Sequence, residues 1–187
     1  MKEKITKAAM DQILKNGFKG FIVDDICKAI GMSKKTVYKY FNSKNEIIAS
    51  VIDYHIENDR IKTHEAIENA GDMISKLKSV MVNYYDYVIP INLINELQSF
   101  FPKEWKKVKD MMAYKQKLFK SVLQEGISKG EIKSSIDIDV LMLIFEKTVP
   151  ALMEASFLEK HDKTYRTANK MLDEFEKIIF YGISYTN

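Results

Sequence analysis

The residues best suited to chemistry lie between Lys34 and Lys44, and their types favour binding to a polyanion. Val37 and Phe41 are four residues apart and supply an apolar stripe on one side of a predicted helix that runs through Phe41. The outward or flanking positions carry ammonium, hydroxyl and phenol groups: Lys34, Lys35, Thr36, Tyr38, Lys39 and Tyr40. A helix that is buried on one side and rich in hydrogen-bond donors on the other suits the major groove of DNA.

A second helical pattern directly precedes this one. Ile26, Cys27 and Ile30 recur at helical spacing, and Gly31 can adopt the positive φ that ends a helix. Ser33 then offers a hydroxyl that can cap the next helix. Two short helices joined by such a turn predict a helix-turn-helix.

The flanking sequence extends the pattern in both directions. A helix is predicted over residues 2–16 and closed by Gly17, and Ser43-Lys44 begins a long helix near Asn45. This arrangement resembles the TetR/AcrR family of one-component bacterial regulators. The residues that carry the resemblance are Gly17-Phe18, Asp25-Ile26, the run from Ala29 to Tyr38, Tyr40-Phe41 and Ser43-Lys44.

The resemblance implies a three-helix DNA-binding head over residues 1–45 and a ligand-binding and dimerisation body over residues 46–187. Lys35 and Thr36 are then expected to contact base edges. Tyr38, Lys39 and Tyr40 lie further along, where family members contact phosphates, with Lys39 or Tyr40 as alternatives for a base contact. Lys44 is expected to bind a phosphate at the start of the next helix.

The chain departs from the family pattern just before the first helix of the pair. Members commonly have a Thr pair there, whose hydroxyls cap the helix and contact a phosphate, whereas this sequence has Phe21 and Ile22. We expect Phe21 to pack as a hydrophobic staple instead. Asp24 stands where some relatives place a basic residue, and its carboxylate can only repel phosphate or accept from cytosine N4.

Charge is distributed unevenly along the chain. Residues 1–44 contain ten Lys and four Asp or Glu, a net charge of +6, whereas residues 45–187 contain nineteen Lys or Arg and twenty-two acidic residues, a net charge of −3. A basic head attracts DNA through counterion release. The alternative, that these lysines only solvate helix surfaces, explains neither the turn nor the Ser-Lys element.

The fold class predicted for the whole chain is all-α, with about nine helices, because only three Pro and seven Gly occur and no strand-like alternation persists. Asp72 is a candidate helix cap, and Gly126 is expected to begin a turn that lasts to Ser135. The helices predicted beyond the head cover residues 45–69, 73 to about 89, 91–100, 103–125, 137–158 and 165–181.

The last two of these helices are candidates for a homodimer interface. In the family, two such helices from each subunit form a four-helix contact, and twofold symmetry then presents two heads to a pseudo-palindromic operator. The alternative is that both apolar stripes belong to the core of a monomer. The candidate interface residues are Val149, Leu152, Met153, Met171, Phe175, Ile178 and Ile179.

The body is also expected to bind a small hydrophobic or amphipathic inducer, which would shift the helix over residues 45–69 like a lever. Thioethers and aromatic rings make adaptable apolar pockets, although the same residues often form plain core. The candidate ligand-binding residues are Met81, Tyr84, Phe101, Trp105, Met112 and Phe145.

Other classes of function find little support. The histidines at positions 55, 64 and 161 have no metal-ligand spacing, and no nucleophile elbow or phosphate loop occurs, so we expect no enzyme, metal or cofactor. No apolar run approaches the ~20 residues of a membrane span. The lone Cys27 and a charged N-terminus without a signal peptide fit the cytoplasm.

Together these features predict a ligand-responsive, sequence-specific DNA-binding transcriptional regulator. Repression is the common mode of the family, so we expect a repressor that its small-molecule inducer releases from operator DNA. The alternative is a helical dimer that binds small molecules and has weak or lost DNA affinity, which Phe21, Ile22 and Asp24 make conceivable.

Overall fold

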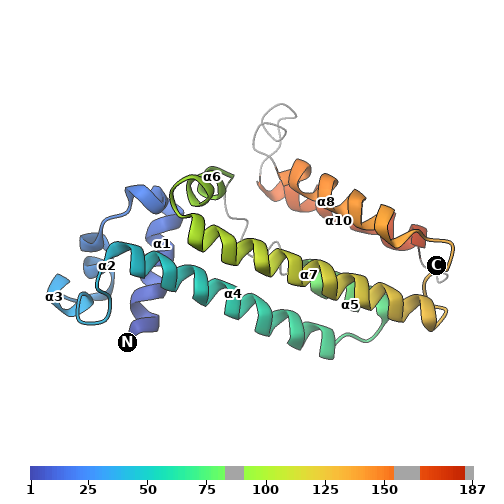
Figure 1. Ribbon diagram of the computed structural model, residues 1–187, viewed down its shortest axis with the longest axis horizontal. Helices are drawn as coiled ribbons and strands as arrows, with labels where there is room; N and C mark the ends of the chain where they lie inside the picture. Colours follow the sequence, from blue (N-terminus) through green and yellow to red (C-terminus); the bar gives the residue numbers. More distant parts are fainter. Residues whose placement is uncertain (83–90, 154–164, 184–187) are drawn as a thin grey trace. The chain divides into compact units, whose positions relative to one another are not determined.

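The computed structural model describes residues 1–82, 91–153 and 165–183, and every element in these ranges is a helix (Figure 1). The predicted all-α class is therefore confirmed. The described helices are α1 (Lys2–Gly20), α2 (Val23–Ile30), α3 (Lys34–Val37), α4 (Lys44–Glu68), α5 (Met73–Val82), α6 (Ile91–Phe100), α7 (Pro102–Ser128), α8 (Ile138–Met153) and α10 (Tyr165–Ile183). None of them is long and apolar enough to cross a membrane.

The chain forms two compact units. The first comprises Met1–Ile61 and the described residues of Tyr87–Met112, and the second comprises the described residues of Lys62–Asp86 and Ala113–Asn187. Helix α6 therefore belongs to the same unit as the three N-terminal helices. The functional boundary predicted at residue 45 remains a prediction.

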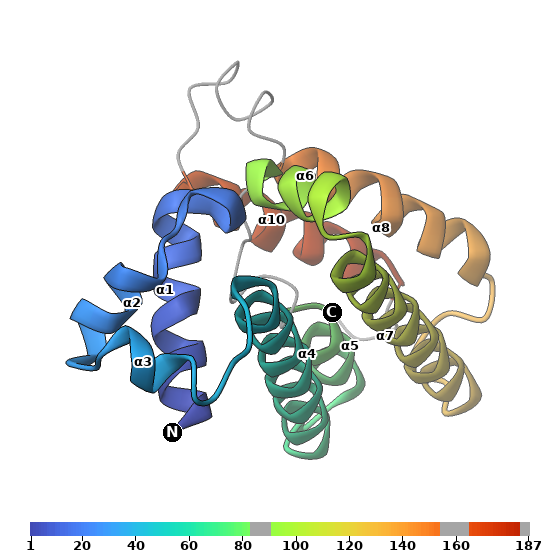
Figure 2. The ribbon, with the colours of Figure 1, turned by 60° about the vertical axis from the view of Figure 1, so that its left-hand side comes forward.

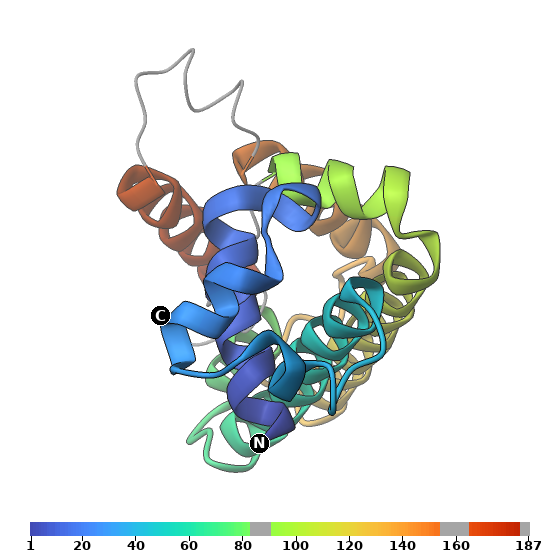
Figure 3. The ribbon, with the colours of Figure 1, turned by 90° about the vertical axis from the view of Figure 1, so that its left-hand side faces the viewer.

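The first unit is built around an apolar core to which every one of its helices contributes. Figures 2 and 3 show α1 lying beside α2, and α2 in turn contacts α3. The core side chains recur at helical spacing on each element, which is why these amphipathic segments fold against one another. They include Ile5, Ala9 and Ile13 of α1, Ile26 of α2, Val37 of α3, Phe41 of the segment between α3 and α4, Ile47, Ile48 and Val51 of α4, and Leu93 and Leu97 of α6.

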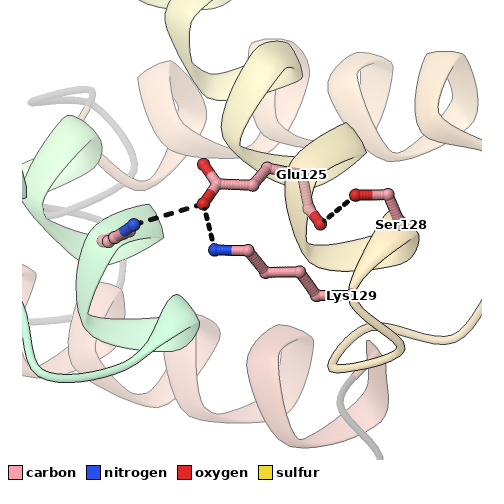
Figure 4. A network of polar contacts seen from close by, with 4 residues as sticks. Glu125, Ser128 and Lys129 are labelled. Carbon is pink, nitrogen blue, oxygen red and sulfur yellow. Dashed lines mark hydrogen bonds and ion pairs between the residues drawn. The ribbon is translucent and has the colours of Figure 1, made fainter.

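The second unit has its own core, organised around the ring of Phe145 in α8. This ring makes edge contacts with Phe119 of α7, at 5.1 Å between ring centroids, and with Phe175 of α10, at 5.3 Å. At the surface, Glu125 forms ion pairs with Lys129 and with Lys76 of α5 (Figure 4). Hydrogen bonds from these two lysines lower the pKa of Glu125.

The turn predicted over residues 126–135 begins later than expected, at Lys129, because α7 continues through Gly126 to Ser128. A Cβ atom at Gly126 would lie 2.6 Å from Cδ1 of Ile132 and 2.8 Å from Cγ of Met73. This glycine therefore permits close packing inside a helix. The predicted cap is confirmed, since Asp72 Oδ1 accepts from the backbone N–H of Ser75 at 2.7 Å.

Candidate nucleic-acid interface

The turn between α2 and α3 has the local geometry that its sequence predicts. Gly31 has φ 68° and ψ 37°, and its N–H donates to the carbonyl of Cys27, as does that of Met32 at 3.0 Å. Ser33 Oγ accepts from the backbone N–H of Thr36 at 3.1 Å and caps α3. Gly31 and Ser33 thus end one helix and begin the next, which confirms the helix-turn-helix.

The helix after this turn is shorter than predicted. Helix α3 ends at Val37, and Tyr38 to Tyr40 form a turn. The N–H groups of Lys39 and Tyr40 donate to carbonyls three residues earlier, at 3.2 and 3.0 Å, which tightens the chain beyond α-helical geometry. The predicted continuation of the helix through Phe41 is therefore wrong, although Val37 and Phe41 are both buried as expected.

The candidate DNA-binding side chains differ in whether they already contact other residues of the chain. Lys35, Tyr38 and Lys39 are exposed, and within the described residues no ion pair is recorded for either lysine. Lys34 Nζ instead donates a hydrogen bond to Asp24 Oδ2 of α2 at 3.2 Å, and this hydrogen bond raises the pKa of Lys34. Tyr40 is half-buried against the core.

Thr36 has a double role at the start of α3. Its hydroxyl lies 2.9 Å from Ser33 Oγ, while its N–H donates to the same oxygen. This places the hydroxyl within the cap and leaves the methyl group of the half-buried side chain for apolar contact. Contact with the methyl group of thymine suits this arrangement.

The substitution of the family's Thr pair has a structural counterpart. Phe21 is fully buried, as the predicted staple requires, and shares the core with Ile26. Ile22, the cap residue of α2, is 53% exposed and forms no side-chain cap hydrogen bond. Helix α2 therefore begins without the hydroxyl cap that the family pattern supplies.

Lys44 lies directly over the ring that replaces threonine. Its Nζ is 4.2 Å from the centroid of the Phe21 ring and donates a hydrogen bond to the carbonyl of Lys19 at 2.7 Å. Burial lowers the pKa of Lys44, and the nearby carboxylate of Glu96 opposes this shift. This intramolecular role of Lys44 was not predicted from the sequence. The aromatic residue at position 21 was the one sequence feature that could have indicated it.

The N-terminus of α4 is fixed by a reciprocal pair of hydrogen bonds. Ser43 Oγ accepts from the N–H of Glu46 at 3.1 Å, and the Glu46 carboxylate accepts from the N–H of Asn42 at 2.6 Å. Such an arrangement resembles a capping box and explains why the Ser-Lys element starts a helix.

Comparison with known proteins agrees with this geometry. Residues 5–51 match the model of the bacterial regulatory proteins of the tetR family. A fatty acid metabolism regulator protein of Bacillus subtilis is 28% identical over 142 residues, which cover 72% of each chain. An uncharacterised helix-turn-helix regulator of the same organism is 21% identical over 187 residues, covering 98% of this chain and 96% of the relative.

The chain belongs to the TetR family. It is an all-α, DNA-binding transcriptional regulator with a helix-turn-helix. Solved structures of TetR-type regulators share its fold. One from Chloroflexus aurantiacus superposes with a TM-score of 0.77 at 19% identity, over 98% of this chain and 96% of the other. FadR of Bacillus subtilis in complex with stearoyl-CoA gives 0.66 at 22% identity, over 91% and 95%.

The candidate ligand-binding residues of this TetR-family chain fall into two groups. Phe101 and Trp105 pack against the core of the first unit, whereas Met81 and Phe145 belong to the core of the second. Met112 is half-buried, and Tyr84 lies outside the described residues. The ligand site remains a prediction.

A small apolar cleft occurs in the first unit, where α1, α4 and α6 meet. None of the candidate ligand-binding residues lines it. Its lining residues are Met10, Ile13, Leu14, Phe18, Val51, Ile52, His55 and Leu93.

The candidate dimer residues are mostly engaged within their own unit. Val149 is buried in the second core, and the side chain of Met153 lies outside the described residues. Leu152, Met171, Phe175 and Ile179 are half-buried. Ile178, in contrast, is 72% exposed. Among the described side chains of α8 and α10, Val140, Leu143, Ile144 and Tyr181 are also large, apolar and exposed, and none of them was among the predicted interface residues.

Proposed function

We propose that this TetR-family chain is a cytoplasmic repressor that binds a pseudo-palindromic operator as a homodimer and is released by a small hydrophobic or amphipathic ligand. The observation that carries the proposal is the helix-turn-helix, in which a Ser33-capped α3 leaves Lys35 and Lys39 exposed beside Thr36. In this proposal Lys35 and Thr36 contact base edges, and Tyr38, Lys39 and Tyr40 contact phosphates or an adjacent base.

The homodimer is supported by the exposed apolar side chains on α8 and α10. Val140, Leu143, Ile144, Ile178 and Tyr181 are all large and more than a third exposed, and apolar surface of this kind favours association. With two subunits, operator half-sites about one helical turn apart, ~34–36 Å, would be bound together.

A charge placed in the interface tests the dimer. Ile178→Glu is expected to shift the protein from dimer to monomer in analytical ultracentrifugation, since a buried carboxylate without a partner is strongly unfavourable. Ile61→Glu is the matched control, because Ile61 is an exposed apolar residue of α4, and this variant should remain dimeric. If Ile178→Glu also stays dimeric at micromolar concentration, α10 is not the interface.

The ligand class follows from similarity to characterised regulators. FadR of Bacillus subtilis was solved in complex with stearoyl-CoA, and a relative with 28% identity is a fatty acid metabolism regulator. A long-chain acyl-CoA combines an apolar acyl chain with the anionic phosphates of coenzyme A, which fits the amphipathic inducer expected from the sequence. Stearoyl-CoA is therefore the first compound to test.

The function as a whole is tested by fluorescence anisotropy at several salt concentrations, with DNA from the region upstream of the gene that encodes this chain. We expect a saturable complex of one dimer per site that is about a thousandfold tighter than binding to random DNA. Addition of stearoyl-CoA should then release the protein from the DNA. Equal binding to upstream and random DNA would refute the repressor and favour a ligand-binding dimer without specific DNA affinity.

A further inference from the structure

The peptide of Lys19 is held between two helices by groups of opposite charge. Its N–H donates to Oε2 of Glu96, on α6, at 3.2 Å, and its carbonyl accepts from Nζ of Lys44, on α4, at 2.7 Å. Only Gly20 and Phe21 separate Lys19 from the cap residue of α2. The segment that leads into the DNA-binding helices is thus fixed from both sides.

Gly17 permits the close approach of Glu96. Its φ of 80° and ψ of 166° interrupt the helical geometry of α1, in a region that is essentially restricted to glycine. A Cβ atom at this position would lie 2.8 Å from Oε1 of Glu96. The turn after Gly17 is therefore a separate piece of α1, and its direction depends on α6.

Helix α6 is firmly attached to this turn, beside which it lies in Figure 2. Leu93 and Leu97 of α6 are 2% and 1% exposed within the core of the first unit. Lys19 Nζ lies 4.0 Å from the ring centroid of Phe100, at the end of α6. A displacement of α6 would consequently act on the Lys19 peptide as well as on the core.

We propose that Glu96 is a positioning residue through which α6 sets the orientation of α2 and α3. The proposal rests on the proposed function, since it supplies a route by which a change in the body reaches the DNA-binding head. Glu96 acts on the head by holding the N–H of Lys19, while Lys44 holds the carbonyl of the same residue. Loss of the Glu96 carboxylate leaves α6 in the core and releases the turn that carries α2.

Hydrogen exchange of the full-length protein, followed by mass spectrometry, tests this role without DNA or ligand. Glu96→Ala should accelerate exchange in residues 18–37 by about fivefold or more, which corresponds to the lower end of common coupling energies. The exchange rates of α5 and α10 should stay unchanged. Glu96→Gln keeps an acceptor oxygen for Lys19 and should remain near wild type. Gln98→Ala, an exposed change on the same helix, is the control. Equal exchange in Glu96→Ala and Gln98→Ala overturns the proposal.

A double-mutant cycle tests the contact itself. Gly17→Ala is expected to lower Tm, because the new Cβ meets the Glu96 carboxylate and the backbone is strained. In the double variant with Glu96→Ala, the new Cβ no longer meets a carboxylate, so the loss of Tm should be smaller than the sum of the single losses. Strict additivity would overturn the proposed contact.

Binding of upstream DNA adds the reciprocal readout. In wild type, DNA should slow exchange in α6 as well as in α2 and α3, because coupling between two sites acts in both directions. Glu96→Ala should retain the slowing in α2 and α3 and lose most of it in α6. Unchanged slowing in α6 overturns the proposal. If the wild-type protein does not bind the DNA, the proposed function is refuted. The role of Glu96 is then still decided by the two measurements made without DNA, which are hydrogen exchange and the double-mutant cycle.

Discussion

Replacing Lys44 by Ala distinguishes a structural role of this side chain from a phosphate contact. The substitution removes a charged hydrogen bond to the carbonyl of Lys19 and a cation–π contact with Phe21. Charged hydrogen bonds contribute about 1.5–3 kcal/mol and cation–π contacts about 0.5–2 kcal/mol. Because Lys44 is only partly buried and partly screened, we take the lower part of the sum, roughly 2–3 kcal/mol.

For a chain of this length, a loss of that size lowers Tm by about 4–12 °C. Differential scanning calorimetry at fixed protein concentration measures it, since dimerisation makes Tm concentration-dependent. Lys39→Ala is the matched control: this lysine is exposed and is proposed to contact a phosphate, so Tm should stay constant while the log–log salt slope of DNA binding falls by about one unit. An unchanged Tm in Lys44→Ala, with the slope reduced as in the control, would refute the structural role.

Three further predictions follow from individual side chains. Gly126→Ala should lower the free energy of unfolding in urea by about 1–3 kcal/mol, because neighbouring side chains already fill the space around this glycine. Gly182→Ala, with no atom within 4 Å of the added Cβ, should raise the free energy of unfolding by about 0.4–1 kcal/mol. Equal effects of the two substitutions would refute the packing argument. Burial raises the pKa of Glu176, so its ionised form is disfavoured at pH 7 and Glu176→Gln should raise Tm there. This benefit should disappear as the pH falls through the raised pKa towards the ordinary value of about 4.5. A lower Tm at pH 7 would mean that the carboxylate has a stabilising partner. Asp24→Asn releases Lys34 from its ion pair and removes a negative charge that repels the DNA phosphates. Binding to random DNA should therefore strengthen, and the log–log salt slope should steepen by about one unit. An unchanged slope would show that the ion pair does not limit DNA contact.

The helix-turn-helix could be predicted because its boundaries depend on local chemistry. Gly31 ends α2 through its own backbone conformation, and Ser33 caps α3 through an N–H three residues away. Asp72 and the Ser43–Glu46 pair act over equally short distances. Signals of this kind are complete within a few residues, so neither the rest of the fold nor a partner is needed to interpret them.

The features that sequence reasoning missed depend on residues far apart in the chain. Gly126 lies inside α7, where Ile132 and Met73 leave no room for a side chain, and no local pattern reveals this. Glu96 contacts residues almost eighty positions earlier, so its charge alone indicated only a polar helix surface. The end of α3 at Val37 likewise reflects the burial of Phe41 by the surrounding helices.

The residue pair that departs from the family pattern has a role in the fold that its sequence does not reveal. Judged from sequence, Phe21 and Ile22 remove a helix cap and a phosphate contact. In the fold, Phe21 supplies a buried ring under Lys44, and the ammonium of Lys44 holds the turn that precedes α2. A packed aromatic ring and a charged hydrogen bond thus stabilise this junction where the hydroxyl cap is missing. The substitution at position 21 therefore affects how the head is held in place, and the exposed Ile22 at the start of α2 is where a direct effect on DNA affinity is to be sought.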